Sequence, residues 1–116
     1  MVESLVKTGR YAWLPGLLIT LLCSVSHAGE QTGVVQAIIT RSSDGLIHIY
    51  MSGTHTNRPP CATSTYWMIK DENSNTGKQQ LAMLLLARAT GQTISVSGTD
   101  SCTRWGDGED LDAISL

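Results

Sequence analysis

The sequence predicts a small, mainly β domain with one helix, and three observations lead to this fold class. The segment 76–91 consists of strong helix formers and ends at a glycine. The segments on both sides of it are rich in β-branched residues and alternate between apolar and polar positions, as strands do. Two cysteines, Cys61 and Cys102, lie in this part of the chain, which is typical of a small exported domain held by a disulfide.

The N-terminal segment 1–28 has the parts of a secretory signal. Lys7 and Arg10 supply a positive start, and residues 14–25 form an apolar middle. The segment ends in Ser-His-Ala, with small residues at the two positions that signal peptidase reads. We therefore expect cleavage after Ala28.

Two alternatives to this cleavage remain open. The first is a retained membrane anchor, although the apolar run is short for a span, which needs about 20 residues. The second is lipoprotein processing before Cys23. Cleavage after Ala28 predicts a mature chain 29–116 that is one domain by size, secreted or periplasmic, with no membrane span of its own.

Three strands are predicted before the helix. The first, 33–41, is joined to the second, 46–51, by a turn at 42–45 that contains a glycine. The loop 53–60 carries two prolines, which exclude a regular strand there. The third strand follows at 62–70.

The segment 76–91 is the one substantial helix that the mature sequence predicts. Ser74 and Thr76 are both suitable N-caps, and Gly91 stands where the helix should stop. The helix is apolar all round from 81 to 87, and a chain this short has too little material to cover it on every side. We therefore expect one face to lie on the protein's own sheet and another on a neighbouring subunit, with an interface formed by Leu81, Ala82, Met83, Leu84, Leu85 and Leu86. The alternative is a helix sunk in a monomer core with its alanine faces exposed.

Two strands are predicted after the helix. Residues 92–97 alternate clearly, a long polar loop spans 98–110, and 111–116 forms a short last strand. The order is then three strands, a helix and two strands, which is the order of the OB-fold, a small and partly open five-stranded barrel. The helix closes the open end of such a barrel, which would bury Leu81, Leu84 and Leu85. A sheet with one helix packed on it is the alternative.

The charge balance of the predicted mature chain argues against several partners. Six Lys and Arg residues face nine Asp and Glu residues, a net charge of −3. An acidic domain without a basic stripe is a poor nucleic-acid binder, because such binding depends on neutralising phosphates. The chain also lacks a basic amphipathic face for a membrane surface.

The chemistry-bearing residues predict a binding protein rather than an enzyme. Cys61 and Cys102 form an even pair in an exported chain, so we expect them to form a disulfide rather than a metal site. No serine has the Gly-x-Ser-x-Gly setting of a hydrolase nucleophile. We expect no catalytic residue, no metal and no cofactor.

The densest polar cluster follows the second cysteine, and it combines one cation, one aromatic ring and three carboxylates on a glycine-rich loop. A sugar ring can stack on the indole while carboxylates accept hydrogen bonds from its hydroxyls. The predicted ligand-binding residues are Arg104, Trp105, Asp107, Glu109 and Asp110. Two alternatives stay open: a loop whose acids are only solvated, and a calcium site, although the spacing misses the EF-hand pattern.

The run from Cys61 to Gly98 resembles the B subunits of bacterial AB5 toxins, in particular the subtilase-cytotoxin and pertussis-like branch. The resemblance rests on a cysteine before a strand that contains Trp67, on the helix that follows, and on the segment TGQTISV at 90–96. It implies an OB-fold, a ring-shaped homopentamer with its helices lining the centre, and glycan binding at the rim. The ending CTRWGDGED departs from those toxins and is similar to a group of short exported bacterial proteins of unknown function.

These observations lead to two function hypotheses. The first is an exported domain that recognises a glycan or another cell-surface ligand as an oligomeric ring. The second is a structural or partner-protein module whose interface is the apolar helix and which binds no small molecule. No binding residue of the toxins is carried over to this chain, because the shared motifs match the layout and not a site.

Overall fold

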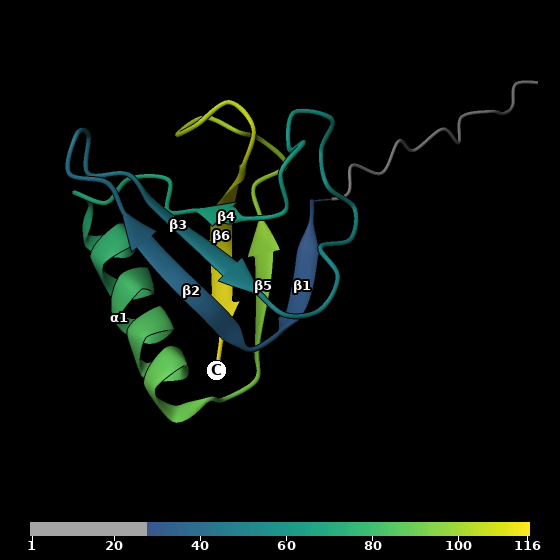
Figure 1. Cartoon of the computed structure of the whole chain (residues 1–116). Coiled ribbons are helices and arrows are strands. Elements are labelled where there is room, and N and C mark those ends of the chain that lie inside the picture. The colour runs from purple at the N-terminus through teal and green to yellow at the C-terminus, as the bar shows by residue number, and fades with distance from the viewer. Residues whose placement is uncertain (1–27) are drawn as a thin grey trace, which may run out of the picture.

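The structure is a computed structural model that describes residues 28–116. The predicted signal segment lies outside the described residues, apart from Ala28. Within these residues six strands and one helix form the fold, and Figure 1 shows their arrangement. In chain order they are β1 (Glu30–Gly33), β2 (Val35–Thr40), β3 (Ile47–Met51), β4 (Trp67–Met68), α1 (Asn75–Thr90), β5 (Ile94–Gly98) and β6 (Glu109–Ser115).

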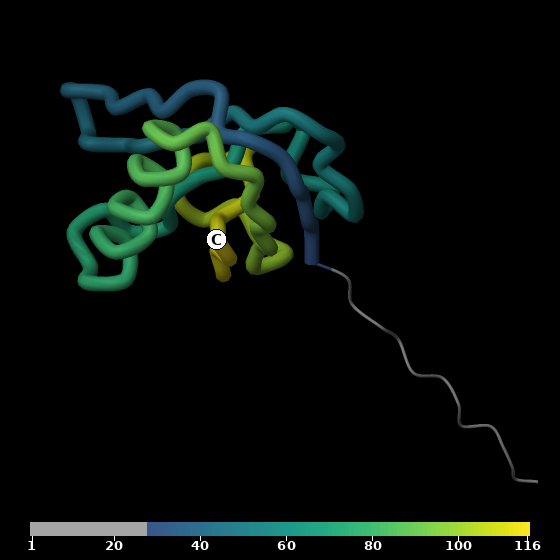
Figure 2. The backbone as a smooth tube through the Cα atoms, turned by 90° about the horizontal axis from the view of Figure 1, so that it is seen from below, coloured from purple at the N-terminus to yellow at the C-terminus, as the bar shows by residue number. Residues whose placement is uncertain are grey.

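All the strands belong to one mixed sheet with the order β1-β5-β6-β4-β3-β2. The pairing of β4 with β6 is parallel, and the other pairings are antiparallel. Figures 1 and 2 both place α1 beside the hairpin of β2 and β3, and the helix contacts β2 more extensively than any other strand. Residues 28–116 are therefore mainly β with a single helix, as the sequence predicts.

The two edge strands of the sheet, β1 and β2, are separated in sequence only by Val34. Ser52 stabilises this junction at Val34. Its backbone N–H donates to the Val34 carbonyl (2.9 Å), and its Oγ accepts from the Val34 N–H (2.8 Å). Gly33 allows the approach, since a Cβ there would lie 2.2 Å from the Ser52 carbonyl oxygen. One stretch of chain thus supplies both edges, although the sheet is not closed.

The strand count differs from the prediction of five. The predicted strand 33–41 begins instead in β1 and is divided at Val34, so four strands precede the helix rather than three. The predicted strand 62–70 shrinks to the two residues of β4. Its preceding residues make turns instead, as Ala62 N–H donates to Pro59 and Thr63 N–H to Cys61. The OB-fold with five strands is therefore not confirmed.

The helix begins and ends where its capping residues predict. Ser74 is the N-cap, and its Oγ accepts from the Gly77 N–H (2.9 Å). Gly91 ends the helix with φ 70°, a left-handed conformation that favours glycine. Leu84 and Ala87 are fully buried in the core, whereas Leu85 is 52% exposed. The expectation that Leu85 is buried inside the domain is wrong, because it lies on the helix face that points away from the sheet.

The core lies between the inner face of the sheet and α1. Its fully buried members include Ile49, Trp67, Ile69 and Leu84, and Ile38, Leu81 and Ile114 pack against it with partial exposure. Removing this apolar surface from water is the main stabilising term of such a domain.

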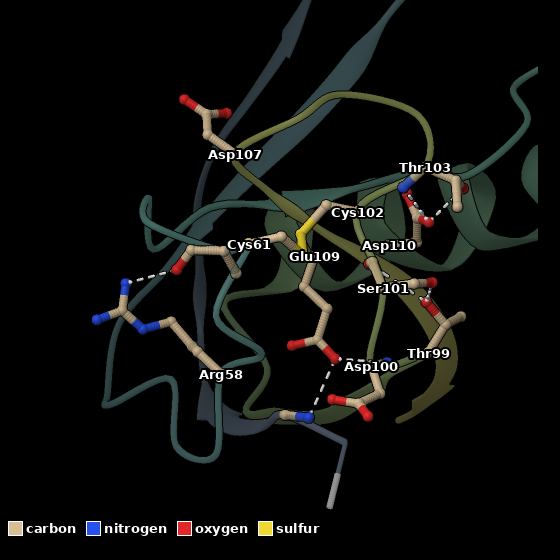
Figure 3. Close-up of a disulfide and its surroundings, with 12 residues drawn as sticks. Arg58, Cys61, Thr99, Asp100, Ser101, Cys102, Thr103, Asp107, Glu109 and Asp110 are labelled. Carbon is tan, nitrogen blue, oxygen red and sulfur yellow. Dashed lines mark hydrogen bonds between the residues drawn. A yellow bond between two sulfur atoms is a disulfide. The ribbon is translucent and has the colours of Figure 1, made fainter.

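The predicted disulfide between Cys61 and Cys102 is present, with the two Cα atoms 6.1 Å apart. It joins the loop before β4 to the loop before β6, as Figure 3 shows. No helix within residues 28–116 is long and apolar enough to cross a membrane.

Candidate functional site

Glu109, one of the five predicted ligand-binding residues, is fully buried. Its Oε2 accepts from the backbone N–H groups of Gly29 and Asp100, both at 3.0 Å, and its Oε1 lies 2.9 Å from His55 Nε2. Figure 3 shows the carboxylate beneath the disulfide, directed toward Asp100. Every contact of this carboxylate is internal, so Glu109 acts within the fold.

The network around Glu109 continues into the core. His55 stacks on Trp67 with the ring centroids 3.9 Å apart, and its Nδ1 lies 3.1 Å from the Thr65 carbonyl. The Trp67 indole N–H donates to Gln31 Oε1 (2.9 Å). Sequence reasoning placed Trp67 in a strand but did not connect it to these polar partners. These contacts give hydrogen-bond partners to the buried indole N–H of Trp67 and to the buried carboxylate of Glu109.

Asp110, the second buried member of the predicted set, organises the loop that carries Cys102. Its Oδ2 accepts from the N–H and the hydroxyl of Thr103 (2.9 and 2.5 Å), and its Oδ1 from the Arg104 N–H (3.1 Å). The contacts with Thr103 are drawn in Figure 3. The loop has no helix or strand at this point, and its hydrogen bonds to the Asp110 carboxylate hold it in place instead.

Arg104 pairs with Glu72, which precedes α1. The guanidinium donates to both Glu72 oxygens (2.9 and 3.0 Å) and to the Asp44 carbonyl (3.0 Å). This bond lowers the pKa of Glu72 below its ordinary value. The two-point contact with Glu72 fixes the loop 99–108 against the segment before the helix, and the bond to Asp44 fixes it against the β2–β3 turn.

Trp105 is the exposed member of the predicted set, at 42%. The Arg41 guanidinium lies over its ring, 4.3 Å from the centroid. Arg41 also pairs with Asp44 through two hydrogen bonds (2.5 and 3.3 Å). That pairing, together with the Leu46 N–H, lowers the pKa of Asp44 from 3.8 to about 2.

Asp107 contacts the end of the segment before β4. It accepts from the Tyr66 hydroxyl and from Ser64 Oγ (3.3 Å). Burial, and then the bond to Asp107, raise the pKa of Tyr66. Asp107 therefore orients the Tyr66 ring at the surface.

Three rings gather beside Asp107 on the outer face of the sheet. The centroid of Tyr66 lies 4.9 Å from that of His48 and 5.7 Å from that of Tyr50, and His48 and Tyr50 are 5.7 Å apart. Tyr50 is 37% exposed. Gly108 connects this group to the indole, because it pairs with Trp105 and lies against Tyr66.

We call this group the aromatic surface, and it is formed by Arg41, His48, Tyr50, Tyr66, Trp105 and Asp107. Within it, burial and then the charge of Arg41 lower the pKa of His48, so the imidazole is neutral at neutral pH. Its Nδ1 is buried and has no hydrogen-bond partner in the described structure. The surface combines flat apolar faces with one cation and one carboxylate at its margin.

A separate cleft of about 450 Å³ lies at the start of α1. Lys70, Ser74, Gln80 and Thr103 are among the residues that line it. Its polar groups are largely used within the fold, since Ser74 caps the helix and Gln80 Nε2 donates to the Asp112 carbonyl. The cleft has no aromatic lining residue, so it offers a poorer sugar platform than the aromatic surface.

The structure thus separates the predicted ligand-binding residues into two groups. Trp105 and Asp107 belong to the aromatic surface, and Arg104 supports the loop between them and the disulfide. Glu109 and Asp110 lie inside. Among the described residues, no group of three or more His, Cys, Asp or Glu side chains could hold a metal ion.

The sequence prediction missed His48, Tyr50 and Tyr66 as surface residues of the site. Alternation along the strand 46–51 puts His48 and Tyr50 on one face, and this was the available signal. Their proximity to Trp105 depends on the pairing of β3 with β4 and of β4 with β6. No short sequence motif predicts this pairing.

Comparisons with known proteins give no relative for this chain. No protein-family profile, no curated protein and no solved structure matches it. The resemblance to the toxin B subunits therefore remains a hypothesis.

Proposed function

We propose that this protein is an exported, non-enzymatic binding domain that recognises a glycan or glycan-bearing cell surface through the aromatic surface. The observation that carries the proposal is the pair of exposed rings, Trp105 and Tyr50, on one side of the molecule beside Asp107 and Arg41. Exposed apolar side chains that gather in one patch mark an interaction site, unlike those scattered singly over a surface.

The chemistry of the surface suits a sugar. The CH groups of a pyranose stack on an aromatic face, and its hydroxyls pair with carboxylate and guanidinium groups. Trp105 remains 42% exposed with Arg41 over it, so its indole still offers contact area. Asp107 uses its oxygens on Tyr66 and Ser64, which holds a carboxylate and a phenol in fixed positions at the margin.

We also propose that the sheet is an OB-type barrel in which β1 and β2 form one bent first strand. Three observations support this: only Val34 separates them, β4 pairs in parallel with β6, and the helix stands between β4 and β5. In this fold ligands bind on one face of the barrel and at its loops, where the aromatic surface lies.

Binding to a glycan array tests the proposal. The wild-type protein should bind a defined subset of glycans, and Trp105→Ala should lose at least tenfold in affinity. Thr90→Ala, an exposed change at the far end of α1, serves as the control and should bind as wild type does. Absence of binding to any glycan, or equal binding by Trp105→Ala, would count against the aromatic surface.

Assembly through α1 is the second candidate function, and one observation favours it. Leu85 and Leu86 are 52% and 53% exposed, and they lie beside the exposed Ala82 and Ala89. We propose that this face meets other copies of the chain, with a pentamer as the favoured ring. In the alternative without a small ligand, the same face binds a partner protein.

A further inference from the structure

The backbone nitrogen of Gly29 lies against a fully buried carboxylate. It donates to Glu109 Oε2 at 3.0 Å, and Gly29 is itself buried. Its carbonyl accepts from the Gly98 N–H (2.9 Å), and β1 begins at the next residue. Gly29 is also the first residue after the predicted signal cleavage, so a sequence prediction and a structural observation concern the same nitrogen.

The Glu109 carboxylate leaves no room for a side chain at position 29. A Cβ on Gly29 would lie 2.1 Å from Glu109 Oε1 and 2.7 Å from His55 Nε2. A Cβ on Gly98 would lie 2.0 Å from Glu109 Oε2. A side chain at either glycine would therefore collide with the carboxylate, and its absence lets the start of the chain approach closely.

The two oxygens of Glu109 differ in their partners. Oε1 faces His55 Nε2 at 2.9 Å, whereas Oε2 accepts only from the backbone groups of Gly29 and Asp100. A buried carboxylate is costly unless cations and hydrogen bonds compensate it. A positive charge at the Gly29 nitrogen would supply a cation at the second oxygen.

We propose that export processing completes this site: cleavage between Ala28 and Gly29 creates an α-ammonium group that forms a buried ion pair with Glu109. Hydrolysis by a signal peptidase consumes one water, breaks the Ala28–Gly29 amide bond, and leaves a carboxylate on Ala28 and an amine on Gly29. The amine takes up a proton from solvent. The amide N–H that now meets Oε2 is thereby replaced by a group with three N–H bonds and a full charge.

The order of events follows from burial. The bond to be cut adjoins the buried Gly29, so the peptidase acts before the domain folds. Folding then places the new N-terminus against Glu109. The processed chain should therefore have a larger folding equilibrium constant than a chain that keeps residues before Gly29. The inference rests on the predicted export signal and is independent of glycan binding, because the aromatic surface uses none of these groups.

The test uses the full-length chain exported by its own signal, with the N-terminus read by intact mass. The wild-type product should begin at Gly29. A variant with two serines inserted between Ala28 and Gly29 should yield a chain whose ammonium lies outside the pocket. The folding equilibrium constant from urea denaturation should be at least tenfold larger for the wild type. A product cut elsewhere, for example before Cys23, or equal constants for the two chains, would overturn the proposal.

Glu109→Gln in both chains provides the matched control. The ratio of the folding equilibrium constants of the two chains should fall at least tenfold, because the side-chain amide that replaces the carboxylate carries no charge. A second measurement does not need that variant to fold. Acylation of the α-amine by an amine-reactive ester should be at least tenfold slower in the native wild type than in the native insertion variant, with equal rates in denaturant. Equal native rates would show a free terminus and contradict the ion pair.

Discussion

The guanidinium of Arg41 lies 4.3 Å above the centre of the Trp105 ring and is held there by its pairing with Asp44. This contact joins the β2–β3 turn to the loop after Cys102, two segments distant in sequence. It fixes the exposed indole at the margin of the aromatic surface. A cation over an exposed indole contributes little to stability, so its main effect is to orient the ring.

The titration of Asp44 should report this pairing. Its pKa is about 2, and the hydrogen bond from Arg41 is the largest cause. Because the value lies below the unfolded 3.8, the stabilising effect is complete above pH 3.8 and is lost as the pH falls through about 2. In Arg41→Gln the pKa of Asp44 should rise toward 3.8, as measured by NMR of the side-chain carboxyl. An unchanged value would mean that Arg41 does not pair with Asp44 in solution.

The glycine at 98 should be intolerant of any side chain. A Cβ there would meet Glu109 Oε2 at 2.0 Å and Trp67 Cζ3 at 2.7 Å, so Gly98→Ala should cost about 1–3 kcal/mol of unfolding free energy. A Cβ on Gly106 would meet no atom within 4 Å, so Gly106→Ala should change stability by less than about 0.5 kcal/mol. Urea denaturation of both variants compares them. Equal losses would contradict the packing described around Glu109.

The disulfide should supply a large part of the stability. Its sequence separation of 41 corresponds to about 4 kcal/mol in the chain-entropy description. The double variant Cys61→Ala/Cys102→Ala should unfold at a correspondingly lower urea concentration, and reductant should shift only the wild type. A wild type that is insensitive to reductant would indicate that the bond does not form in solution.

The exposed leucines of α1 should decide the oligomeric state. Lysine at both Leu85 and Leu86 should convert a ring into monomers with little effect on the stability of the protomer, because both side chains are about half exposed. Gln79→Lys, on the exposed side of the same helix, is the control for an added positive charge and should leave the mass unchanged. Light scattering after size exclusion gives the mass. A wild-type monomer would contradict assembly through α1.

The sequence predicts local structure well where the cause is local. Ser74 and Gly91 set the ends of α1 through their own capping geometry, and the hairpin turn at 42–45 follows from its glycine. The third predicted strand shortened to β4 because its pairing partners, β3 and β6, meet it at only two residues. Such pairing depends on the whole sheet.

The candidate site shows the same division. Trp105 and Asp107 are on the surface, as a glycine-rich loop with an aromatic residue suggests. The roles of Glu109 and Asp110 were not readable, because their donors come from Gly29, His55 and Asp100 in one case and from the turn of the loop in the other. In the sequence, a carboxylate within a polar segment gives no sign of whether it faces solvent or accepts hydrogen bonds inside the fold.

The most direct measurement is a two-dimensional NMR titration of the oxidised mature protein with a panel of oligosaccharides. The predicted mature chain has two tryptophans, so two indole N–H signals are expected, and Trp105→Phe identifies one of them. Trp67 is fully buried and bonded to Gln31, so its signal serves as an internal reference. Glycan binding at the aromatic surface should shift the Trp105 signal in a saturable way and leave the Trp67 signal in place. A panel that leaves Trp105 unmoved, or a ligand that moves only signals of α1, would contradict the account.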